Sequence, residues 1–82
     1  MFYIRAKKVQ TIIKNPIGNK IKAARKNLGL TQDQVSARLQ TEGCDISRGT
    51  LAKIEIGIRK LKASEVSAFV KVLNLDYKDF LE

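Results

Sequence analysis

Residues 30–57 read LTQDQVSARLQTEGCDISRGTLAKIEIG, and this stretch decides the fold. Thr31 and Gln34 stand three residues apart, which is the spacing of a capping box at the start of a helix. We therefore expect a helix that begins after Thr31 and ends near Gln40. Ser47 is a second residue of the type that caps helix N-termini, so another helix should follow it. The stretch predicts two short helices joined by a turn.

The apolar residues of these two segments indicate which side of each helix is buried. Val35 and Leu39 lie four residues apart in the first segment, on one helical face. Leu51 and Ile54 lie three apart in the second, which should end at residues 56–57. Both helices are therefore expected to pack on a shared core.

Residues 41–46, TEGCDI, form the predicted turn, and Gly43 is the expected site of positive φ. Cys44 is the single cysteine of the chain, which excludes an intramolecular disulfide. We interpret Cys44 as a small turn residue in preference to a redox switch.

Toward the N-terminus, residues 17–27 are expected to form the preceding helix. Its apolar positions have the spacing of a buried stripe: Ile17, Ile21, Ala24 and Leu28. Gly29 then stands where a left-handed residue ends a helix.

Residues 1–15 are basic and partly alternating, and they fit an arm, a short strand or a helix over 5–14. The basic run at 5–8 is interpreted as a solvated tail, with an arm into the DNA minor groove as the alternative. Pro16 breaks the pattern, so we divide the chain into an N-terminal extension, 1–15, and a domain, 16–82.

Toward the C-terminus, a basic loop at residues 58–62 precedes a predicted helix over 63–73. Asn74 is suited to the left-handed conformation that ends a helix. Asp76 should then cap a final short helix over 77–81. The core positions of these two helices are expected to be Val66, Phe69, Val70, Leu73, Phe80 and Leu81.

The charge distribution points to a polyanionic partner. The chain has 82 residues and a formal net charge of +8, as expected of one small basic domain. Eight cations and no acid fall within the first 32 residues, whereas the last 20 hold two cations and four acids. A basic half with an acidic end is typical of a surface that binds nucleic acid.

Composition also argues against catalysis. Histidine, the commonest general base, is absent, and a single cysteine excludes metal sites built on His or paired Cys. We expect no enzyme activity, no metal, no cofactor and no small-molecule effector. Because the sequence has neither an apolar run of membrane-spanning length nor a signal peptide, we expect a soluble cytoplasmic protein.

With the central helices placed, residues 17–81 resemble the Cro and phage-repressor type of helix-turn-helix domain, also called the xenobiotic-response-element family. The matching stretches are IGNKIKAARKNLGLTQDQV, ISRGTLAKIEIGIRK and VSAFVKVLNLDYKDFL. The resemblance implies an all-α, compact five-helix fold of the lambda-repressor type. It also implies binding to double-stranded operator DNA, usually as a homodimer.

The resemblance implies roles for individual residues. Those expected to face base edges are Arg48, Gly49 and Lys53. Those expected to meet the DNA backbone are Gln32, Ser47, Thr50, Arg59 and Lys60. Gln32 would also steady the first residue of the reading helix. The guanidinium of Arg48 suits a bidentate contact to guanine O6 and N7. Arg25 and Glu55 match a pair that forms a partly buried salt bridge between the first and the reading helix.

One departure from the family pattern concerns the connection over 39–47. It is about five residues longer than the usual tight turn, although added loop length costs little entropy. A changed angle between the two helices would alter the base contacts more than the fold.

The leading hypothesis is a sequence-specific transcriptional regulator, a repressor, that reads the major groove with the helix near Ser47. Cations of the loop and of the first helix would fix its register on phosphates. The alternative is a protein-interaction module of the same fold, such as an antitoxin-like partner, and RNA binding is a third option. The expected dimer surfaces are the helix over 77–81 and the apolar residues Phe2, Tyr3 and Ile4.

Overall fold

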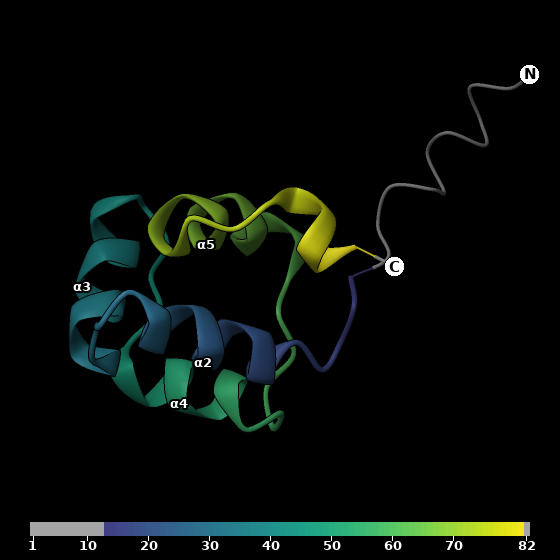
Figure 1. Ribbon diagram of the computed structural model, residues 1–82. Coiled ribbons are helices and arrows are strands. Elements are labelled where there is room, and N and C mark those ends of the chain that lie inside the picture. Colours follow the sequence, from purple (N-terminus) through teal and green to yellow (C-terminus); the bar gives the residue numbers. More distant parts are fainter. Residues whose placement is uncertain (1–12, 82) are drawn as a thin grey trace, which may run out of the picture.

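Four α-helices and two 3-10 helices make up the regular structure of residues 13–81, which the computed structural model describes. In chain order they are α2 (Gly18–Asn27), α3 (Gln32–Thr41), α4 (Arg48–Glu55), η1 (Ala63–Glu65), α5 (Val66–Leu73) and η2 (Tyr77–Phe80). Figure 1 shows α2 lying between α4 and α5, with α3 standing across one end of all three. The all-α fold expected from the sequence is confirmed.

The core lies where these helices converge, and the four α-helices and η2 each contribute at least one side chain to it. Its fully buried large residues are Ile21, Val35, Leu39, Ile46, Leu51, Ile54, Phe69, Leu73 and Phe80. The helix α3 packs against both α4 and α5, so it joins these two helices to each other. Burial of such side chains is the main source of stability for a domain of this size.

Local capping interactions set where α3 and α4 begin, as the sequence predicts. The Thr31 hydroxyl accepts a hydrogen bond from the Gln34 backbone N–H at 3.1 Å, and the Gln34 carboxamide oxygen accepts from the Thr31 N–H at 2.8 Å. At α4 the Ser47 hydroxyl accepts from the Thr50 N–H at 3.1 Å. These bonds satisfy N–H groups that a helix leaves without partners.

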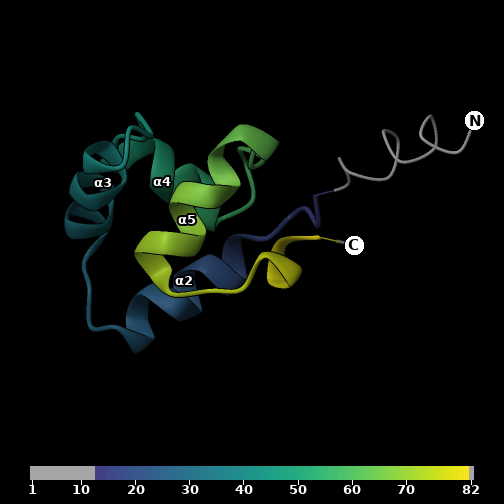
Figure 2. The same ribbon diagram turned by 90° about the horizontal axis from the view of Figure 1, so that it is seen from above.

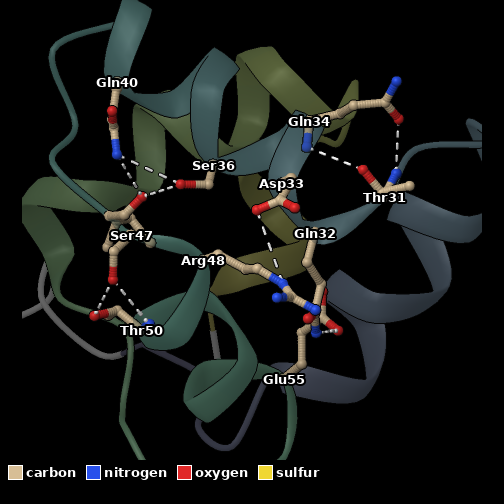
Figure 3. A network of polar contacts seen from close by, with 11 residues as sticks. Thr31, Gln32, Asp33, Gln34, Ser36, Gln40, Ser47, Arg48, Thr50 and Glu55 are labelled. Carbon is tan, nitrogen blue, oxygen red and sulfur yellow. Dashed lines mark hydrogen bonds and ion pairs between the residues drawn. The ribbon is translucent and has the colours of Figure 1, made fainter.

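The long connection between α3 and α4 is held against the body of the domain. Gly43 has a φ of +84°, which allows the chain to turn after α3. The Ile46 side chain is buried, and its carbonyl accepts from the Ser36 hydroxyl at 2.6 Å and from the Gln40 carboxamide at 3.3 Å (Figure 3). The start of α4 is therefore fixed to α3 in spite of the added loop length.

The two ends of the described chain meet on one side of the domain (Figure 2). The Lys14 N–H donates to the Phe80 carbonyl at 2.8 Å, and Ile13 forms an isolated antiparallel bridge with Leu81. Asn15 exchanges two hydrogen bonds with the Leu61 backbone. The arm, strand and helix interpretations of residues 1–15 concern mainly residues 1–12, which lie outside the described residues.

Three details of the structure differ from the sequence interpretation, and they concern where a helix ends or which type of helix forms. Leu28 is 44% exposed, because α2 ends at Asn27 and the helical register of the stripe is lost there. The helix expected over 63–73 begins as the 3-10 helix η1, and only residues 66–73 are α-helical. The final element, η2, is also a 3-10 helix and ends at Phe80.

Leu81 differs from the expectation for a related reason. Its backbone is extended, with φ −108° and ψ 146°, and its side chain is 40% exposed. Leu81 pairs with Ile13 in this extended conformation. Its side chain therefore lies outside the core, in which Phe80 is buried. In the described part of the chain, then, four of the five expected helices are α-helices.

Candidate nucleic-acid interface

The helix α4 has one buried and one exposed side. Leu51 and Ile54 are 0% and 1% exposed and face the core. Arg48, Gly49 and Lys53 are exposed on the opposite side, with Gly49 one helical turn before Lys53. A short helix held on one side and free on the other is the geometry with which a helix enters a DNA groove.

The N-terminal end of α4 keeps one hydroxyl donor that no group of the described fold accepts. The Ser47 hydroxyl donates a hydrogen bond to the Thr50 hydroxyl at 3.0 Å, and the Ser47 oxygen accepts one from the Thr50 backbone N–H. The pair therefore keeps one hydroxyl hydrogen that can be donated to an outside acceptor. A Cβ added to Gly49 would meet nothing within 4 Å, so the space in front of this residue is open.

The opposite end of α4 is tied to α2 and α3 by a buried ionic network. Arg25 Nε and Nη2 donate to Glu55 Oε2 and Oε1 at 2.7 and 3.0 Å, and Arg25 Nη1 donates to the Leu30 carbonyl at 3.0 Å. The two side chains are 11% and 1% exposed. The hydrogen bonds that Arg25 donates to Glu55 raise the pKa of Arg25 further above its ordinary value, so the guanidinium stays charged.

Gln32, the first residue of α3, belongs to this buried network. Its carboxamide nitrogen donates to Glu55 Oε1 at 3.0 Å (Figure 3). The residue that contacts Arg48 is its neighbour Asp33, with Arg48 Nε and Asp33 Oδ1 at 3.8 Å. The roles expected of Gln32 stay predictions, and the contact between Asp33 and Arg48 was missed, although an acidic residue at the start of α3 was the available signal.

Arg59 is also engaged within the fold. Its Nη1 and Nη2 atoms donate to Glu65 Oε1 and Oε2 at 2.7 and 2.8 Å, and the Arg59 side chain is 27% exposed. Burial alone would raise the pKa of Glu65, but the hydrogen bonds from Arg59 and from the Lys62 N–H lower it below its ordinary value. A phosphate contact by Arg59 would therefore compete with this ion pair, whereas Lys60 beside it is exposed.

Cations gather at the junction of α2, α3 and α4. An open cleft of about 600 Å³ lies there, and its lining includes Lys22, Lys26 and Arg48. Asp33 is the only acid among the residues that line this cleft. The cleft lies beside the first turn of α4, so the lysines of α2 and Arg48 at the start of α4 belong to one surface.

Among residues 13–81 no group of three or more His, Cys, Asp or Glu side chains is placed to hold a metal ion. Over the same residues, each helix is too short or too polar to cross a lipid bilayer. Cys44 is half-buried, and this burial raises the pKa of its thiol, which reduces the reactive thiolate form.

Comparison with known proteins supports the assignment of α3 and α4 to a helix-turn-helix unit. A family model described as helix-turn-helix matches residues 21–80, a span that contains α3, the long turn and α4 and ends with η2. No curated protein and no solved structure gives a significant match to the chain. The match covers most of the chain and includes the two helices on which the sequence argument rests. The chain belongs to the helix-turn-helix family of the Cro and phage-repressor type, a family of DNA-binding transcription regulators.

Proposed function

We propose that this protein is a sequence-specific regulator of transcription that binds double-stranded DNA and acts as a repressor by occupying its operator. The observation that carries the proposal is the division of α4 into two sides. Glu55, Leu51 and Ile54 anchor the helix, while Arg48, Gly49 and Lys53 remain exposed. The side chains of the anchored side are already packed in the core or paired with Arg25. The exposed side can therefore enter the major groove without a rearrangement of the fold.

Specificity comes from the first turn of α4 in this proposal. Arg48 donates two hydrogen bonds to guanine O6 and N7, the commonest specific contact of arginine with DNA. Gly49 lets the backbone of α4 approach the base edges, because no side chain intervenes. Lys53 lies one turn further along the same side and reaches a base or a phosphate.

Phosphate contacts fix the position of the domain on the duplex. The exposed lysines Lys22 and Lys26 of α2 flank the start of α4 on one side, and Lys60 follows α4 in the chain. The free hydroxyl hydrogen of Ser47 and Thr50 supplies a further donor to a phosphate oxygen. Such contacts hold the register but carry no sequence information themselves.

A homodimer completes the proposal, because a single short helix reads only a few base pairs. Two-fold dimers place two reading helices one DNA turn apart. The side chain of Tyr77, in η2, is 50% exposed and belongs to one of the surfaces expected to form this dimer. The other expected surface, Phe2, Tyr3 and Ile4, lies outside the described residues.

Selection of bound duplexes from a random pool, followed by titration at several salt concentrations, tests the proposal. A conserved motif should emerge, and its affinity should exceed that of random duplex by at least ~10³-fold. If five or six phosphates are neutralised, log K should fall against log salt with a slope of roughly −5. Enrichment of no motif would overturn the proposal, and preferential binding of structured RNA would favour the RNA alternative.

Two exposed isoleucines favour the second candidate function, a protein-interaction module. Ile56 and Ile58, on either side of Gly57, are 67% and 71% exposed directly after α4. A loop that only met phosphates would have no use for two apolar side chains there. Absence of binding to random duplex at low salt would favour this candidate over a DNA reader.

A further inference from the structure

Asp33 and Arg48 face each other across the two helices of the reading unit. Asp33 lies in the first turn of α3 and Arg48 begins α4, and their side chains approach over the basic cleft (Figure 3). Asp33 Oδ1 lies 3.8 Å from Arg48 Nε, and the two side chains are 76% and 66% exposed. No role for Asp33 follows from the proposed function as stated above.

We propose that Asp33 is a specificity-determining residue that positions Arg48 for its base contact. This inference rests on the proposed function, since it concerns the same DNA-reading side of α4. The carboxylate acts on Arg48 and does not touch the base.

The atoms involved show how this works. A guanidinium has five N–H donors, of which the Nε–H lies on the inner side of the group. The Asp33 carboxylate lies nearest that inner nitrogen. The outer edge, formed by Nη1 and Nη2, stays free for the two acceptors of a guanine. Asp33 thereby favours one orientation of a long, otherwise mobile side chain.

A structural role does not account for the pair. Ion pairs between exposed side chains contribute little to folding stability. The first turn of α3 is already capped by Thr31 and Gln34, so it does not depend on Asp33 for its backbone bonds. In addition, a carboxylate in a cleft lined by cations opposes the binding of phosphates in general. This repulsion is the same for every DNA sequence, so it lowers affinity without lowering specificity.

The test is a double-mutant cycle on the full chain. The selected duplex is first altered one base pair at a time to find the pair whose preference Arg48→Ala removes. Dissociation constants for the selected duplex and for the duplex altered at that pair are then measured for four proteins: wild type, Asp33→Asn, Arg48→Ala and the double variant. Asp45→Asn is the matched control, because Asp45 is also exposed and its replacement changes the net charge equally.

We expect Asp33→Asn to lower the ratio of the two dissociation constants by about three- to tenfold, part of the discrimination that a bidentate arginine contact supplies. The same substitution should leave the ratio unchanged in the Arg48→Ala background. Affinity for random duplex should rise with Asp33→Asn, while Asp45→Asn should leave the ratio at its wild-type value. Equal melting temperatures of the variants would exclude unfolding as the cause.

Two sets of results would overturn the inference, and they differ in what else they overturn. A wild-type ratio in Asp33→Asn, or an equal drop in the control Asp45→Asn, would remove the positioning role and leave the proposed function intact. A wild-type protein with no preferred base pair at all would overturn the proposed function together with this inference.

Discussion

The two ion pairs made by the ends of α4 are alike in chemistry and opposite in setting. At the C-terminal end Glu55 pairs with Arg25 at 2.7 Å, and the two side chains are almost completely buried. At the N-terminal end Arg48 meets Asp33 at 3.8 Å, and both side chains are mostly exposed. The first pair determines where the helix lies, whereas the second leaves its arginine available to a partner. One helix of eight residues thus has an anchored end and a free end.

The largest effect in this comparison is expected from Arg25→Ala. Removal of one partner leaves the buried Glu55 carboxylate without its counter-charge, which costs about 3–5 kcal/mol of the free energy of unfolding. Urea unfolding followed by circular dichroism measures this loss. The matched change at the other end, Arg48→Ala, should alter the stability by less than ~0.5 kcal/mol. Similar losses for both variants would contradict the division of α4 into an anchored and a free end.

A pair of glycines tests the same division through packing. A Cβ on Gly18 would overlap the carbonyl oxygens of Ile54 and Glu55, because the start of α2 lies directly against the end of α4. Gly18→Ala is therefore expected to destabilise the domain by about 1–3 kcal/mol. Gly49→Ala meets no atom and should raise the stability by up to about 0.5–1 kcal/mol.

Thermal unfolding of the two glycine variants checks these signs, and DNA titration adds a second readout. Gly49→Ala should weaken binding to the selected duplex while the fold remains intact, because its methyl group occupies the space into which the base edges would come. A Gly18→Ala variant as stable as wild type would show that α2 and α4 are not in the close contact that the argument requires.

A smaller effect is expected from the ion pair that holds the loop after α4. The pKa of Glu65 is lowered in the folded state, so its carboxylate stabilises the fold above its ordinary pKa of 4.5, and this contribution disappears as the pH falls further. Glu65→Gln should therefore be less stable than wild type at pH 7, and the difference should shrink below about pH 4.5. Melting temperatures from pH 7 to pH 3 measure the difference, and a constant gap would contradict the assigned cause.

Structural features that involve residues close together in the chain could be predicted from the sequence, whereas features that depend on distant contacts could not. The caps at Thr31 and Ser47 were predicted correctly, because a cap involves residues only three apart in the chain. The ends of the helices were harder, as Leu28 and Leu81 show, because tertiary contacts decide where the last turn stops. The bridge between Ile13 and Leu81 joins residues from opposite ends of the domain, and no local pattern announces it.

The interface shows the same limit. The roles of Arg48, Gly49 and Lys53 were predicted from the family pattern, and all three residues lie on the exposed side of α4. Their DNA contacts stay a prediction. Two ion pairs between elements were missed, Arg59 with Glu65 and Arg48 with Asp33. Both depend on how the loop and the helices pack against each other.

The central claim is that the exposed side of α4 reads bases while neighbouring cations hold phosphates. Its most direct test compares Arg48→Ala with Lys60→Ala on the selected duplex and on duplexes altered at single base pairs. Arg48→Ala should abolish the preference at one base pair. Lys60→Ala should weaken binding to all duplexes alike and reduce the salt slope by about 1. If both variants lowered the affinity for every duplex by the same factor, α4 would not be the helix that reads the sequence.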